Sequence, residues 1–314
     1  MPPQAWEYLV NKAKSLKPEL AFMAESLDGG AVSKRAGRQF DIINDSWVWG
    51  MLNGSPNTTA IRAEIDSRKA AYGFAGVMRG LINHDQSAPA NKWWTLSRYA
   101  IGCAIDGAPQ MFMGQELGYS DHFGFSKWRF EYDRWIPNIR DYYSMQTLWN
   151  DAAPDKDALW NRYREVNLGR QRAPVLRLAN QWYLDQVNGW GTHQRIFSTL
   201  RYEKYGWDAK DQEVVLCFVN LDPGTANSGT FQMNVPAIYL NPSTKYNVRN
   251  LASSKPDDYL WPTAKTGSEI VSQGLFISFP ANLYQEGSVA QFLKLEAEGP
   301  KGPKTGYSSV TVAG

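Results

Sequence analysis

Short apolar runs alternate with helical patterns in the first half of the chain. Each apolar run ends in polar or acidic residues, and the four runs span residues 20–24, 40–43, 80–82 and 107–113. Apolar positions repeat with the spacing of an amphipathic helix in residues 5–16, 58–72, 91–105 and 157–172. Strands that alternate with helices are typical of βα units, so we predict an α/β fold with a parallel sheet.

The pattern changes after about residue 187. Short β-type runs follow one another, separated by turn-forming clusters such as Asp222-Pro223-Gly224, with no helical pattern between them. They span residues 195–202, 213–220, 230–235, 246–250 and 275–279. We therefore predict an antiparallel β-sandwich over residues 187–295, after an α/β domain of residues 1–186 and before a Gly/Pro-rich tail of residues 296–314.

Composition excludes several classes of protein. The 33 basic and 31 acidic residues nearly balance, which does not fit binding to nucleic acid or to a membrane surface. No apolar run reaches the roughly 18 residues that cross a bilayer, and the N-terminus lacks signal-peptide features, so the compartment stays open. The two cysteines form no disulfide framework, and no ligand spacing indicates a metal or a cofactor. The 13 Trp, 16 Tyr and 13 Phe suit a core, and aromatic rings near a surface also stack on sugars.

Acidic residues follow all four predicted strands of the α/β part. They are Glu25, Asp45, Asp85 and Glu116. Functional side chains in parallel α/β sheets gather at the carboxyl ends of strands, although a single acid there is more often a helix cap or a turn former. Two carboxyl groups that converge in one cleft are what glycoside hydrolysis requires.

Three segments carry a family resemblance. Residues 81–85 (LINHD) resemble the end of the seventh barrel strand in the alpha-amylase family of glycoside hydrolases. Residues 22–25 (FMAE) are similar to the fifth-strand segment of that family, and residues 107–116 (GAPQMFMGQE) to its eighth-strand pattern. The motifs come in the family's order and precede the expected sandwich, so the resemblance covers about residues 5–295.

The resemblance implies a fold and a set of site residues. The fold is a partial (β/α)8 TIM barrel, strands five to eight, followed by an all-β antiparallel sandwich domain. Glu25 would be the proton donor and then the base, and Asp85 would hold sugar hydroxyls and stabilise positive charge on the ring. His84 would donate a hydrogen bond to the same sugar, with Asn83 beside it in the substrate site. Loop aromatics that could stack on glucosyl rings are Trp47, Trp49, Trp93, Trp94, Tyr119 and Phe123.

One member of the family's catalytic trio has no counterpart. The family's nucleophile is an aspartate at the end of the fourth strand, two residues after an arginine, and the residues before Glu25 contain no such strand. The α/β part also holds four predicted strands where a closed barrel of about 250 residues has eight. We therefore expect a chain that lacks the N-terminal part of the barrel, and with it the nucleophile.

Two functions remain open at this point. The first is an alpha-amylase-type glycosidase or transglycosidase that acts on α-glucosidic linkages by a retaining mechanism, with an α-glucan or another α-glucoside as substrate. It would need the missing N-terminal half as a partner, or self-association. The alternative is a non-catalytic carbohydrate-binding or assembly module derived from the same fold.

Overall fold

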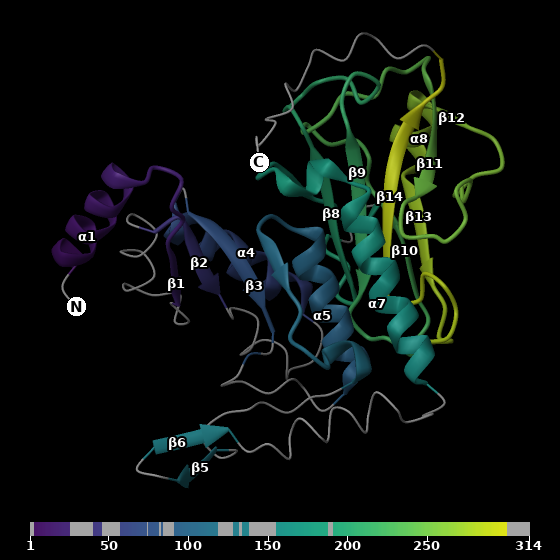
Figure 1. Cartoon of the computed structure of the whole chain (residues 1–314). Helices are drawn as coiled ribbons and strands as arrows, with labels where there is room; N and C mark the ends of the chain where they lie inside the picture. The colour runs from purple at the N-terminus through teal and green to yellow at the C-terminus, as the bar shows by residue number, and fades with distance from the viewer. Residues whose placement is uncertain are drawn as a thin grey trace.

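In the described residues the two largest sheets are of different type, one parallel and one antiparallel, and helices lie between them (Figure 1). The computed structural model describes residues 3–25, 40–45, 57–73, 75–81, 83, 91–118, 128–131, 134–137, 155–187 and 191–299. Within these ranges a parallel sheet with its helices comes first along the chain, and the sheet-rich part follows.

The first sheet is parallel throughout, as predicted. Its strands are β1 (Met23–Glu25), β2 (Ile42–Asp45), β3 (Gly76–Gly80) and β4 (Ala108–Gln110), and they lie side by side in chain order. β3 ends at Gly80, where the predicted strand of residues 80–82 begins, so this prediction was displaced toward the C-terminus. Arg79 interrupts the apolar pattern of β3, but its side chain is buried, with its Cβ atom beside Gly102 of α5. Its guanidinium pairs with Asp106 at 3.0 Å, so the buried charge has a partner.

The predicted helices of the α/β part form with nearly the predicted bounds. They are α1 (Pro3–Leu16), α4 (Thr58–Tyr72), α5 (Lys92–Ala104) and α7 (Lys156–Gln171). Asn57 caps α4 by accepting a hydrogen bond from the backbone N–H of Ala60, and Asn91 accepts from the first turn of α5 in the same way. Smaller elements between them are η1 (Gln115–Leu117), the hairpin of β5 (Trp128–Glu131) and β6 (Arg134–Pro137), and η3 (Pro174–Arg177).

The sheet-rich part contains a six-stranded antiparallel sheet and a separate antiparallel pair. The strands of the larger sheet, in spatial order, are β12 (Lys265–Thr266), β11 (Lys245–Asn250), β14 (Ala290–Ala297), β9 (Val214–Asn220), β8 (Ile196–Tyr202) and β7 (Gln181–Tyr183). The pair consists of β10 (Asn227–Phe231) and β13 (Leu275–Phe279). An α/β fold with a sheet-rich part is thus confirmed.

Several details of this part differ from the sequence prediction. A short helix, α8 (Gly267–Gln273), does interrupt the strands, and its first turn is closed by a capping box between Thr266 and Glu269. β7 and β14 were not predicted, because polar residues interrupt their apolar patterns. β10 begins three residues before its predicted start.

The strands β8 and β9 of the six-stranded sheet are buried on both faces. Every residue of β8 and β9 is buried. On one face Phe197 and Cys217 pack in one cluster with residues of α5 and α7, and on the other face Phe218 packs against Phe231 of β10. α5 also contacts β3 and β4, so this helix lies between the two sheets (Figure 1).

Buried arginines connect the helices to the sheet-rich part. Arg62 of α4 donates to the backbone oxygen of Leu184 and to Asp185, both next to β7. Arg98 of α5 donates to the backbone oxygen of Leu221, and Arg201 of β8 donates to that of Ala104 at the end of α5. Because these contacts cross the helical layer, the orientation of the parallel sheet is fixed relative to the rest of the molecule.

Candidate active site

Glu25 ends β1, at the carboxyl edge of the parallel sheet. In the register of the sheet it pairs with Asn44 of β2, and Asn44 pairs with Met78 of β3. The preceding row of residues paired across the strands, Ala24, Ile43 and Val77, packs in one cluster with Tyr72 of α4. Since side chains alternate along a strand, Glu25 and its row point to the face away from α4. The Glu25 side chain is exposed there.

Asn83 follows β3 at the same edge of the sheet. It is 6% exposed, whereas Glu25 is open to solvent. β2 lies between β1 and β3, and at the usual strand spacing of about 4.8 Å the two strands are about 10 Å apart. Glu25 and Asn83 thus belong to strand ends that are separated by one strand.

Most other residues of the predicted site lie outside the described ranges. These are Asp85, His84, Trp47, Trp49 and Tyr119, together with Phe123. Of the two predicted stacking aromatics on α5, Trp93 is 8% exposed and belongs to the core, so it is not available to a sugar. Trp94 instead carries the guanidinium of Arg98 over its ring at 5.3 Å.

Glu116 adds a carboxyl group to the turn that follows β4, a position for which the sequence suggested no role. One of its carboxylate oxygens is buried and has no hydrogen-bond partner among the described residues. The turn around it is tightly held, because the side chain of Gln115 accepts from the N–H of Phe112 and donates to the hydroxyl of Tyr163. Burial raises the pKa of Tyr163, and the charge of Glu116 adds to this shift. Glu116 is the last residue of the eighth-strand motif of residues 107–116, and this position was the available sequence signal.

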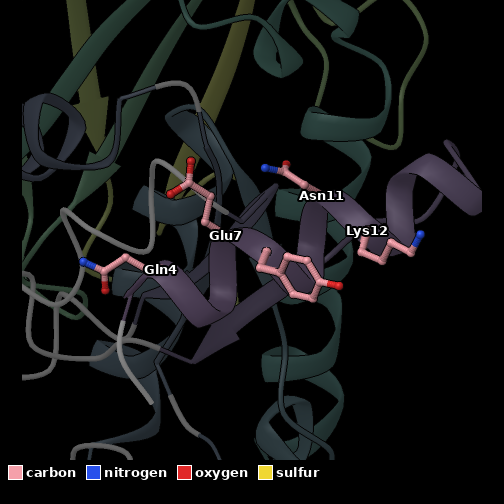
Figure 2. Close-up of a pocket in the computed structure, with 5 residues that line it drawn as sticks. Gln4, Glu7, Asn11 and Lys12 are labelled. Carbon is pink, nitrogen blue, oxygen red and sulfur yellow. The ribbon is translucent and has the colours of Figure 1, made fainter.

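The surface hollow in Figure 2 is separate from this edge. Its lining residues all belong to the exposed side of α1, namely Gln4, Glu7, Tyr8, Asn11 and Lys12. None of them is a predicted catalytic residue, and the hollow therefore adds nothing to the site at the carboxyl edge.

The described ranges were compared with two simple structural requirements, those of a metal-ligand cluster and of a membrane-spanning helix. No group of three or more His, Cys, Asp or Glu side chains there could hold a metal ion. No described helix combines the length and the apolar character needed to cross a bilayer. The polar side chains described at the edge include the carboxyl group of Glu25 and the amide groups of Asn44 and Asn83.

Comparison with known proteins gives matches among solved structures only. No protein-family model and no curated protein matches the sequence. The chain is similar to a noncanonic maltogenic alpha-amylase from Thermotoga neapolitana, with 15% identity and a TM-score of 0.60, over 94% of this chain and 59% of that one. An alpha-amylase from H. orenii gives 17% identity, a TM-score of 0.60, and 94% and 57% coverage.

A third structure, AmyP in complex with maltose, is 12% identical with a TM-score of 0.59 and is covered over 62% of its length. The chain thus spans less than two thirds of the structures that it matches. Identities this low bear on the fold alone. The chain has the fold of part of an alpha-amylase-family enzyme, and the family resemblance of its motifs is confirmed at the level of the fold.

Proposed function

We propose that this chain carries the acid/base side of an α-glucoside-cleaving active site. One observation carries the proposal. Glu25 ends β1 and Asn83 follows β3 at one edge of a parallel sheet that has the alpha-amylase fold. In this proposal β1 to β4 are strands five to eight of a (β/α)8 barrel of residues 1–186, and the sheet-rich part is a C-terminal β-sandwich domain of residues 187–295.

The proposed roles follow the retaining mechanism. Glu25 donates a proton to the glycosidic oxygen as the bond breaks, and in the second step it takes a proton from water or from an acceptor hydroxyl. Asp85 holds two sugar hydroxyls and stabilises the positive charge of the flattened ring. His84 and Asn83 bind the same sugar, while Trp47, Trp49 and Tyr119 stack on neighbouring ones.

The nucleophile in this proposal comes from outside the chain. A retaining enzyme needs a second carboxylate about 5 Å from the acid/base. The side chains beside Glu25 on its sheet face are Asn44 and Met78, and neither is a carboxylate. The exposed Met23, on the same face as Glu25, is 51% accessible, and Met113 after β4 is 55% accessible. A surface of this kind is suited to contact with the other half of a barrel, and a second copy of the chain is the alternative occupant.

An α-glucan is the proposed substrate. Structures with this fold were solved in complex with maltose and with maltotriose. Others are a cyclomaltodextrin glucanotransferase and an isomaltulose synthase in complex with sucrose. Hydrolysis and transfer of glucosyl units both use the acid/base role assigned to Glu25, so the proposal covers both.

The test is reconstitution. The chain is mixed with a polypeptide that supplies strands one to four of an alpha-amylase barrel, and release of reducing ends from maltoheptaose is measured. We expect no turnover by the chain alone, turnover by the mixture, and a loss of at least about 1,000-fold with Glu25→Gln. Turnover by the isolated chain would refute the external nucleophile. A reconstituted activity that survives Glu25→Gln would refute the role of Glu25.

A further inference from the structure

Two amide side chains share the sheet face of Glu25, and we call them the amide pair. One is Asn44 of β2, which pairs with Glu25 in the register of the sheet, and the other is Gln110, which ends β4. Gln110 pairs with Gly80 of β3, two residues beyond Met78, and Met78 pairs with Asn44. Since side chains alternate along a strand, both amides lie on the same face as Glu25.

The amide of Asn44 is buried without a partner. Only 9% of the residue is exposed, and within the described part of the chain its amide makes no hydrogen bond. The amide atoms are nevertheless not fully enclosed, so the accessible part of the residue includes them. A buried amide without a partner destabilises the folded state, and native proteins contain few of them. Asn44 therefore has the burial and the free hydrogen-bonding groups of a ligand-binding residue.

The side chain of Gln110 reaches across β3 toward β2. A Cβ atom at Gly80 would lie 2.6 Å from Oε1 of Gln110 and 3.5 Å from its Cδ, so the amide end of Gln110 lies over Gly80. The backbone of Gly80 does not have a positive φ, so this position uses the space that glycine leaves rather than its conformational freedom. Gln110 is partly buried, and its amide also has no hydrogen-bond partner in the described ranges.

The two amides approach β3 from its two sides. β3 lies between β2 and β4. Gly80 adds no side chain to this interval, and Gln110 shortens it by leaning over Gly80. A ligand that lies over β2 and β3 can therefore contact both amides, with Glu25 on its β1 side.

The chemistry of this face favours a neutral ligand that carries hydroxyl groups. Each amide has a donor and an acceptor, as each sugar hydroxyl does, so the two can pair in either direction. Glu25 is the one charged side chain that the described strands β1 to β4 place on this face. These strands thus offer no cation to an anionic ligand, whereas a sugar finds hydrogen-bonding groups on two sides.

We propose that Asn44 and Gln110 bind hydroxyl groups of the sugar next to Glu25 and select an uncharged sugar at this position. The inference rests on the proposed function for the choice of an α-glucan. The amide pair holds the sugar by hydrogen bonds and takes no part in proton transfer.

The experiment is a titration of the full chain with maltoheptaose, followed by NMR on the side-chain amide signals of the pair. The variants are Asn44→Leu, Gln110→Met and the double variant, in which side chains of similar size lack the amide. We expect binding to be about 5-fold weaker in each single variant and at least about 10-fold weaker in the double variant, as for the loss of one and of two hydrogen bonds. Glu25→Gln should bind like the unaltered chain.

The matched control carries the same two changes where the amides already have partners. Asn180 donates to the backbone oxygen of Glu203, and Gln291 donates to that of Ser278, both at exposed positions of the sheet-rich part. The double variant Asn180→Leu, Gln291→Met should bind maltoheptaose normally.

A second readout separates ligand binding from a structural role. Asn44→Leu should melt at the temperature of the unaltered chain or up to about 2 °C higher, because an apolar side chain replaces a buried amide without a partner. Gly80→Ala should weaken binding as Gln110→Met does, since its Cβ atom displaces the amide end of Gln110.

Four results would overturn the proposal. They are unchanged binding by the double variant, an equal loss in the control, a lower melting temperature of Asn44→Leu, and no maltoheptaose binding by the unaltered chain. If binding is lost in the double variant while reconstituted turnover fails, the amide pair stands and the catalytic proposal falls. If turnover is reconstituted and the double variant keeps the same KM, the amide pair falls and the catalytic proposal stands.

Discussion

Replacing Arg62 by alanine should destabilise the whole molecule, because this side chain connects α4 to the sheet-rich part. Its guanidinium donates to the backbone oxygen of Leu184 at 2.6 Å, to Ser198 at 3.1 Å, to Asp185 at 2.6 Å and to Thr192 at 3.0 Å. It also lies over the ring of Tyr183 at 5.0 Å. No single replacement side chain can restore this set of contacts.

The size of the effect follows from which partners stay buried. The side chain of Asp185 is 49% exposed and regains water when Arg62 is removed. Leu184 and Ser198 are fully buried, although the Ser198 hydroxyl still donates to the oxygen of Leu184. Two charge-assisted hydrogen bonds to buried acceptors, at about 1.5 kcal/mol each, give a loss of about 3 kcal/mol. That loss lowers the melting temperature by about 8 °C for a domain of this size.

The assay is thermal and urea unfolding of Arg62→Ala beside Arg195→Ala. Arg195 is the matched control, since its side chain is 56% exposed and lies 3.8 Å from Asp222, a geometry worth less than about 1 kcal/mol. We expect a single unfolding transition in both variants, shifted down only in Arg62→Ala. Equal shifts, or separate melting of the two sheets in the unaltered chain, would refute the view that buried arginines hold the parts together.

Two further predictions concern titratable groups. Burial raises the pKa of Cys103 and of Cys217 to about 12. Neither thiol should therefore react with a thiol reagent at neutral pH until the protein is unfolded. Labelling of the native chain would contradict this prediction and show that the core opens. Hydrogen bonds from Lys14 and from the N–H of Phe22 lower the pKa of Asp41 in the folded state. An acid whose pKa is lowered by folding stabilises the folded state above its unfolded pKa of about 4, and this stabilisation is lost as the pH falls below that value. The protection of the α1 amides against deuterium exchange, measured relative to the unfolded chain at the same pH, should therefore fall in acid, and Asp41→Asn should remove this pH dependence. An unchanged acid response in that variant would contradict the role of the ion pair.

The parallel sheet was predictable because its strands and helices follow simple periods. Three of its strands overlap the predicted apolar runs, whereas β3 ends at Gly80, where the predicted run begins. The helices α4 and α5 form nearly where their apolar patterns place them, and Asn57 and Asn91 are recognisable caps. The apolar pattern did not predict a strand correctly where a charged side chain is buried or where one side of the strand is polar. β14 is the second case, because Lys294 and Glu296 interrupt its apolar residues and pair with neighbouring strands.

The candidate site was predictable only in part. The strand-end position of Glu25 could be inferred from the sequence, because an apolar run ends there and parallel strands share an edge. The exposure of Trp207 and Tyr239 could not be predicted, since both residues stand in turn-like segments where no period separates an exposed ring from a core ring. The two segments lie about 30 residues apart in the sequence and are joined by the hydrogen bond from the N–H of Tyr239 to the oxygen of Trp207.

The exposure of Glu25 bears directly on how the proposed site would work. A general acid is most effective when burial or a neighbouring carboxylate keeps it protonated near neutral pH. The described surroundings of Glu25 supply neither, since its side chain is exposed and its neighbours on the sheet face are Asn44 and Met78. A second surface that covered this face would exclude water from Glu25, bury Met23 and bring a carboxylate close, and all three changes favour catalysis. The proposed function therefore requires that glucan cleavage and the covering of this sheet face occur together.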